Sequence, residues 1–263
     1  MENTTESVPM SDPHVPTQQE TAPTPFVLPK PKKLFTEAWA LFKNNWKYLV
    51  RMCVIGMLFM CLAMLPAILI LVIGGASNVG ILFIIGIILL LIPVYVGLWF
   101  MVSFVRAVAL LVDEGKTLTT KEFFSAQNRP FIWKYFWLRI LVGIIVFAGF
   151  ILFIVPGVIF ATWFSFASFV LIFEGTKITE ALTRSKSYVK GRTGAVLWRW
   201  IYVGLVQILF FIGLAIIVAI IPGTAGEIVD FIGQLVLNIV WMPLLLIYGY
   251  MFYKLVKNNP VTK

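Results

Sequence analysis

Residues 140–173 read ILVGIIVFAGFILFIVPGVIFATWFSFASFVLIF, a run without a charged side chain. About 20 residues of helix cross ~30 Å of hydrocarbon, so a run of this length is enough for more than one crossing. Near its middle, Pro156 stops one helix and Gly157 permits a turn. We therefore predict two transmembrane helices, Trp133 to Val155 and Gly157 to Phe173, in a tight helical hairpin.

Similar apolar runs on both sides of this hairpin predict four further spans. Two precede it, at about Met52 to Ile73 and Val79 to Val112, and two follow it, at about Ala195 to Ile221 and Ile228 to Tyr253. The run from Val79 is longer than one perpendicular crossing and contains Pro93, so we expect a tilted or kinked helix. The fold class is an all-α polytopic membrane protein with about six spans in three hairpins.

The overall composition is that of a membrane protein. Hydrophobic residues make up 60% of the chain, charged residues 13%, and the mean hydropathy is +0.94. A transmembrane β-barrel would show segments of about ten residues that alternate apolar and polar, whereas these runs are continuous.

A polar, amphipathic segment precedes each predicted hairpin. From Leu34 to Leu49, aromatic residues recur at helical spacing opposite lysines, which predicts a helix on the membrane surface. The stretch from Asp113 to Lys134 is polar and charged, with a small apolar face, and Ile178 to Arg192 is amphipathic and basic. We expect all three at the cytoplasmic side.

The distribution of basic residues predicts the orientation. The turns after the first, third and fifth spans carry no lysine or arginine, only Glu227 and Asp230, so all 21 basic residues fall on the other side. Short loops rich in lysine and arginine stay in the cytoplasm, so both termini are predicted there and the chain in the cell (inner) membrane. Because the basic residues lie beside apolar spans, the net charge of +9 does not indicate nucleic-acid binding.

The domain organisation follows from these segments. Residues 1–31 are rich in proline, acidic and polar, and are predicted to be a disordered cytoplasmic tail. Residues 32–257 form the six-span membrane domain, and residues 258–263 form a cytoplasmic C-terminal tail.

The sequence offers no metal or cofactor site. Cys53 and Cys61 are eight residues apart in one predicted helix, ~12 Å along its axis, so they cannot form a disulfide within it. His14, the one histidine, lies in the tail. We predict no bound metal or cofactor.

A basic cluster in the third surface helix is the first candidate site. It can contact anionic lipid phosphates at about 1 kcal/mol per charge. Membrane lipids, chiefly anionic, are therefore the predicted partners, while a homo-oligomer and a membrane-protein partner both remain open. The cluster contains Arg184, Lys186, Lys190 and Arg192.

Polar residues within the predicted spans form the second candidate site. Gln207 and Asn238 lie at comparable depth, so they are expected to form a hydrogen bond between helices or to line a substrate path together with Glu174. Glu174 ends the fourth span and can pair with Arg106.

A series of residues through the middle of the chain matches the pattern of a known family. They are Pro156, Gly157, Trp163, Phe164, Glu174, Ala181, Leu182, Arg184, Ser185 and Gly191. With these residues the chain resembles a bacterial and archaeal family of six-helix membrane proteins that includes the YciC-like proteins and the membrane domain of glycerophosphoryl diester phosphodiesterases. The matching residues cover about a sixth of the chain, and Phe169 stands where members often carry a proline. Since the phosphodiesterases have a separate soluble catalytic domain, the resemblance implies a membrane domain without the hydrolase.

The predicted function is therefore that of a non-enzymatic integral membrane protein, a lipid-interacting or accessory, scaffolding membrane domain. A small transporter or channel that uses the polar residues inside the spans is the alternative. The sequence contains no phosphate-binding loop, nucleophile elbow or paired catalytic carboxylates that would indicate a membrane-embedded enzyme.

Overall fold

The computed structural model describes residues 28–77, 79–125, 128–221 and 223–259. Most of the predicted N-terminal tail and of the C-terminal tail lies outside these residues. Within them, all regular secondary structure is helical, which confirms the all-α prediction for this part of the chain. The helices are α1 (Pro31–Ala76), α2 (Gly80–Leu89), α3 (Leu91–Glu114), α4 (Thr120–Phe123), α5 (Arg129–Leu152), α6 (Ile154–Trp163), α7 (Ala167–Glu174), α8 (Ile178–Val189), α9 (Thr193–Ile220) and α10 (Thr224–Asn258).

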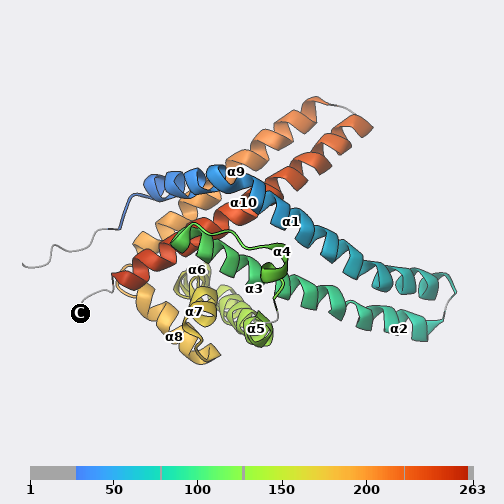
Figure 1. The fold of residues 1–263 in the computed structure, drawn as a ribbon, viewed down its shortest axis with the longest axis horizontal. Coiled ribbons are helices and arrows are strands. Elements are labelled where there is room, and N and C mark those ends of the chain that lie inside the picture. Colours follow the sequence, from blue (N-terminus) through green and yellow to red (C-terminus); the bar gives the residue numbers. More distant parts are fainter. Residues whose placement is uncertain (1–27, 78, 126–127, 222, 260–263) are drawn as a thin grey trace, which may run out of the picture.

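Six helical segments are long and apolar enough to cross a membrane. They are α1, α2 with α3, α5, α6 with α7, α9, and α10. In Figure 1, the second half of α1 runs beside α2, and α9 runs beside α10, as two arms. The arms diverge from a common body, which contains α3 to α8 and the adjoining parts of α1, α9 and α10. The arms present apolar side chains outward, as Leu209 at 68% and Phe231 at 70% exposure illustrate. Such surfaces suit hydrocarbon as the surrounding solvent.

The predicted surface helix and first span are joined in α1. The backbone leaves helical geometry at Asn45 (φ −119°, ψ 16°), and α1 changes direction near its middle in Figure 1. The Asn45 side chain donates a hydrogen bond to the carbonyl of Leu41 at 3.0 Å. An asparagine that bonds backbone locally competes with the helical ladder, which explains the break.

The turn between α5 and α6 lies earlier than predicted. The chain is extended at Phe153 (φ −165°, ψ 157°), whereas Pro156 falls in the first turn of α6. Proline is tolerated in a first turn because the N–H that it lacks has no partner there. Placing the turn at Pro156 and Gly157 was therefore wrong by three residues.

The long second run is interrupted where its proline predicts. Leu90 separates α2 from α3, and Pro93 is the third residue of α3. The two helices follow each other closely in Figure 1, so together they act as one bent span.

The hydrophobic core lies in the body, where residues far apart in the sequence meet. Phe104, Phe123, Phe166 and Tyr248 are completely buried there. Phe123, in α4, packs against Phe104 with ring centroids 6.1 Å apart. The short polar segment after α3 is thus attached to the body by its aromatic face.

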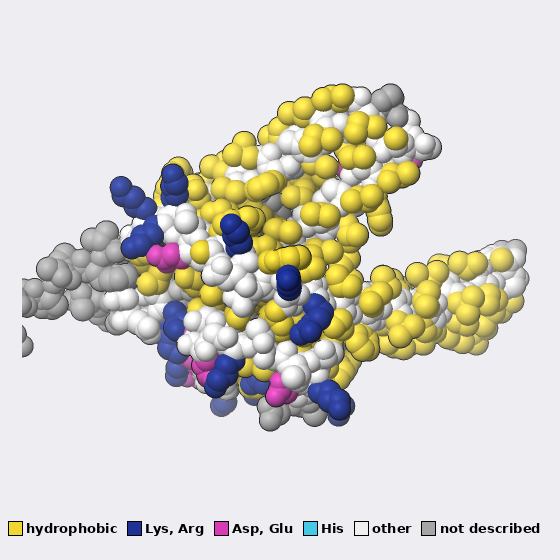
Figure 2. All heavy atoms as spheres, turned by 45° about the horizontal axis from the view of Figure 1, so that its top comes forward, with side chains coloured by type: hydrophobic (Ala, Val, Ile, Leu, Met, Phe, Trp, Pro, Cys, Tyr) yellow, Lys and Arg dark blue, Asp and Glu magenta, His cyan; other side chains and the backbone are white. Residues whose placement is uncertain are grey.

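Charged side chains gather on this body. Figure 2 shows lysines and arginines over the body on the visible face, while the two projecting arms are covered by apolar side chains. The sequence agrees, since residues 52–105, 140–173 and 200–226 contain no charged residue.

Glycines bring α5 and α6 into close contact. A Cβ added to Gly149 would lie 2.9 Å from the Cα of Gly157 and 2.8 Å from the Phe160 ring. A methyl group therefore has no room between the helices. On the same helix, a Cβ added to Gly143 would meet no atom within 4 Å.

We expect Gly149→Ala to destabilise the protein by about 1–3 kcal/mol, the usual cost of overpacking, because two backbones must separate. Thermal unfolding of the detergent-solubilised protein, followed by size-exclusion chromatography, measures the effect. Gly143→Ala is the matched control and is expected to unfold at the wild-type temperature or higher. Equal losses for the two variants would contradict the close packing.

Candidate functional site

Glu174 lies where three helices meet. It is the last residue of α7, and Gly175 (φ 64°) follows in the left-handed conformation that lets the chain turn toward α8. Its side chain is only 6% exposed although it carries a charge. A buried carboxylate is costly unless it is paired and hydrogen-bonded, so its partners decide its role.

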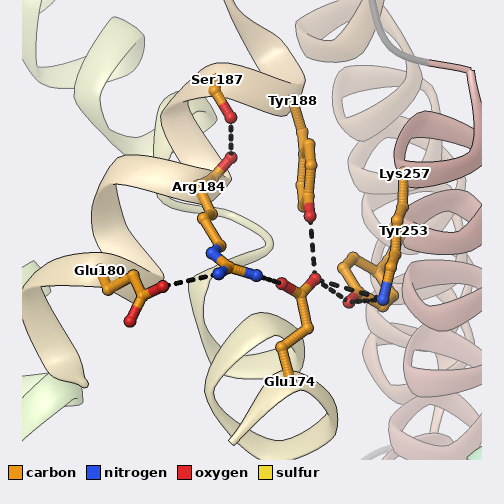
Figure 3. Close-up of polar contacts among 7 residues, drawn as sticks. All are labelled: Glu174, Glu180, Arg184, Ser187, Tyr188, Tyr253 and Lys257. Carbon is orange, nitrogen blue, oxygen red and sulfur yellow. Dashed lines mark hydrogen bonds and ion pairs between the residues drawn. The ribbon is translucent and has the colours of Figure 1, made fainter. Parts of the chain in front are cut away.

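Both carboxylate oxygens of Glu174 have partners, as Figure 3 shows. Oε1 accepts hydrogen bonds from the hydroxyls of Tyr188 at 2.9 Å and Tyr253 at 2.7 Å, and lies 3.3 Å from Lys257 Nζ. Oε2 accepts from Arg184 at 2.6 Å. These contacts connect α7 to the next helix, α8, and to α10, which is far away in the sequence. We call Glu174 with Arg184, Tyr188, Tyr253 and Lys257 the Glu174 cluster.

Glu180 and Arg184, four residues apart on α8, also form an ion pair. Arg184 donates its second guanidinium nitrogen to Glu180 at 2.6 Å, four residues earlier on α8. With Glu174 and Glu180 as anions and Arg184 and Lys257 as cations, the assembly has two charges of each sign and is neutral.

The environment of the Glu174 cluster shifts the pKa values of its α8 members. Burial, reinforced by the hydrogen bond to Glu174, raises the pKa of Tyr188 to about 12. Hydrogen bonds to Glu174 and then to Glu180 raise the pKa of Arg184. Both residues therefore keep their protons at neutral pH, and the cluster acts as a permanent tie between helices.

The expected ion pair between Arg106 and Glu174 is not formed. Glu174 pairs with Arg184 instead, and Arg106 donates a hydrogen bond to Asn128 at 2.7 Å. Arg106 is on α3, and its hydrogen-bond acceptor, Asn128, lies just before α5. The partners of Glu174 come instead from α8 and α10. Local sequence gave no means of choosing among the arginines.

The four basic candidates around α8 have different environments. Lys186 and Lys190 are exposed, and Lys186 Nζ lies 4.3 Å from the centre of the Trp163 ring. Arg184 is engaged by the two glutamates. Arg192, just before α9, donates to the carbonyl of Val256 at 2.7 Å, which ties the link between α8 and α9 to the end of α10. Of these four basic residues, Lys186 and Lys190 are thus the ones whose charge is free to bind a ligand.

Gln207 and Asn238 come together, but Glu174 lies elsewhere. Both amides line a pocket of only about 10 Å³ between α9 and α10, enough for about one water molecule. The Asn238 amide donates to the carbonyl of Gln234 on its own helix at 2.8 Å. Tyr253, which contacts Glu174, is fifteen residues further along α10, roughly 22 Å at the helical rise.

The sequence reasoning missed the tyrosines of the Glu174 cluster. Tyr188 follows Arg184 by four residues, and Lys257 follows Tyr253 by four, so each pair shares a helix face. This four-residue spacing was the one sign in the sequence that the members of each pair could act together. That both faces point at Glu174 depends on the packing of α8 against α10.

Arg199 was also missed, because it lies inside a predicted span. It is 6% exposed and donates to the carbonyls of Leu28 at 2.8 Å and Pro29 at 2.6 Å. Tyr248 donates to the Arg199 carbonyl at 3.2 Å. Arg199 therefore fastens the segment before α1 to α9.

Helices of this length and apolarity define a multi-pass membrane protein. In the described part of the chain, no group of three or more His, Cys, Asp or Glu residues is placed to hold a metal ion. No family model, curated protein or solved structure matches the chain. Membership of the YciC-like family therefore stays a prediction from the residues given above.

We expect Glu174→Gln to lower the free energy of unfolding by about 1–3 kcal/mol, since it removes the charge that two tyrosines, an arginine and a lysine share. Thermal unfolding in detergent measures the loss. Glu180→Gln is the control, because it removes the other carboxylate of Arg184 on the exposed side, and we expect little change. If both variants lost the same stability, the tie would not depend on Glu174.

Proposed function

We propose that the chain is a non-enzymatic, multi-pass protein of the cell (inner) membrane that holds anionic lipid at its cytoplasmic face, as a lipid-interacting or scaffolding domain. The observation that carries this proposal is the free charge of Lys186 on α8 and of Lys190 directly after it, next to apolar spans. Figure 2 gives it support, because lysines and arginines gather on the body beside the apolar arms.

The environment of α8 suits a helix at the membrane interface. Its buried face includes Ala181, Leu182 and Val189, which pack onto the body, and its other face is polar. Trp163 lies next to it and donates a hydrogen bond from its indole N–H to Thr193 at 3.1 Å. Tryptophan favours the headgroup region, so Lys186 above this ring would lie level with lipid phosphates.

The proposed orientation places the lysines and arginines of the body at the cytoplasmic side of the membrane. In it, three hairpins of two spans each enter the membrane from the cytoplasm, each preceded by a surface helix, and both termini stay inside. The support is the absence of lysine and arginine from the turns at residues 77–79, 153 and 221–223. The pocket around Gln207 and Asn238 has a volume of about 10 Å³, so it adds no support to the transporter alternative.

We expect the double substitution of Lys186 and Lys190 by glutamine to weaken retention of anionic lipid, by about fivefold for each charge removed. Native mass spectrometry of the purified protein with phosphatidylglycerol and phosphatidylcholine measures the retention. The control replaces both lysines by arginine, which keeps the charge and is expected to keep the preference. Equal retention of both lipids by the wild-type protein would refute the lipid proposal.

We expect single cysteines at Ser77, Phe153 and Thr224 to react with an impermeant thiol reagent outside intact cells, after Cys53 and Cys61 are replaced. All three positions are exposed in the structure. Cysteines at Ser187 and Lys121 are the cytoplasmic controls, expected to react only after permeabilisation. Outside labelling of either control would overturn the orientation.

A further inference from the structure

A second polar site lies in the body and shares no residue with the Glu174 cluster. It is a pocket of about 600 Å³ between α3, α4 and α10, a size typical of small-molecule sites. Three charged side chains line it, one cationic and two anionic: Arg106, Asp113 and Glu122. The pocket therefore presents both signs of charge to one small volume.

Arg106 is held in place with most of its donors unused. Its NH1 group donates to Asn128 at 2.7 Å, and Asn128 in turn donates to Ser103 at 2.7 Å. Asn128 and Ser103 are 4% and 1% exposed, so this support is rigid. The guanidinium also lies 4.8 Å from the Phe131 ring centre. A guanidinium has five N–H donors. Among the described residues, Arg106 takes part in no ion pair.

The acidic side of the pocket is formed by two exposed residues, Glu122 and Asp113. Glu122 Oε2 accepts from the backbone N–H and the hydroxyl of Thr119, both at 2.8 Å, which fixes the carboxylate in a capping box. Asp113 accepts from Tyr250 at 2.6 Å and Lys254 at 2.5 Å on α10. The hydrogen bonds to Glu122 use one oxygen, so its Oε1 can accept from an ammonium group.

Apolar side chains also line the pocket. Leu110, Leu118 and Phe173 line the pocket together with the ionisable residues. A ligand that suits this lining has an oxyanion at one end, an ammonium group at the other and a short hydrocarbon link between them. Arginine favours phosphate and carboxylate oxygens because its planar fork can bind two of them at once.

We propose that this pocket binds an amino-phosphate zwitterion, with the phosphate on Arg106 and the primary ammonium group on Glu122 and Asp113. The ligand is either the headgroup of a lipid or the corresponding free molecule, since both carry the same charges. The site is separate from the lysines of α8, so it stands or falls independently of the proposed contact with anionic lipid.

Isothermal titration of the full chain in detergent with O-phosphoethanolamine and with glycerol 3-phosphate tests this binding mode. The amine-bearing ligand is expected to bind at least fivefold more tightly. Glu122→Gln should remove that preference and leave glycerol 3-phosphate unaffected, because glutamine also completes a capping box and keeps α4 in place. Arg106→Gln should weaken both ligands at least tenfold.

Glu114→Gln is the matched control. Glu114 is next to Asp113 but pairs with Lys116 and does not line the pocket, so neither affinity should change. The thermal unfolding temperature of each variant shows that it is folded. Failure of wild-type protein to prefer the amine-bearing ligand, or a preference that survives Glu122→Gln, would overturn the proposal.

Lipid retention distinguishes the two sources of the ligand. A lipid site should retain phosphatidylethanolamine over phosphatidylcholine, whose quaternary ammonium cannot donate a hydrogen bond, and Glu122→Gln should abolish that difference. A site for the free molecule should show the titration result without any lipid preference. If neither ligand nor lipid distinguishes wild type from Glu122→Gln, no zwitterion site exists there.

Discussion

Hydrocarbon penalises an unpaired charge by several kcal/mol or more, which explains why the long apolar stretches of this chain carry no charged side chain and why its lysines and arginines gather on the body. Residues 52–105, 140–173 and 200–226 carry none, and these stretches include most of the outward-facing arms. The backbone obeys the same constraint, since helices pair their own N–H and C=O groups. The polar side chains that hold particular helices together or that could bind a ligand must therefore lie in the body, where the helices meet.

The polar contacts in the body differ in how completely they are satisfied. Glu174 is surrounded by donors from α8 and α10 and belongs to a neutral assembly, so it stabilises the packing of three helices. Arg106 has one neutral partner and faces a pocket that also contains two carboxylates. A saturated cluster holds the fold, whereas an unsaturated, rigid one is available to a ligand. This contrast separates the structural site from the candidate binding site.

Particular residues show how far sequence reasoning reached. The break before Pro93 follows from ring geometry, and the Glu180–Arg184 pair follows from helical spacing. The turn between α5 and α6 did not follow from Pro156, because a proline fits a first turn as well as it ends a helix. The partner of Glu174 was misassigned because several arginines were equally plausible along the chain.

The sequence by itself determined that the chain is helical, that six segments are able to cross a membrane, and that basic residues lie at one set of ends. These properties depend on local composition and period, which any segment carries alone. Only the tertiary structure decided that Tyr188, Tyr253 and Lys257 converge on Glu174 and that Arg106 shares a pocket with Asp113. Such meetings depend on how helices from distant parts of the chain pack, and no local pattern encodes that geometry.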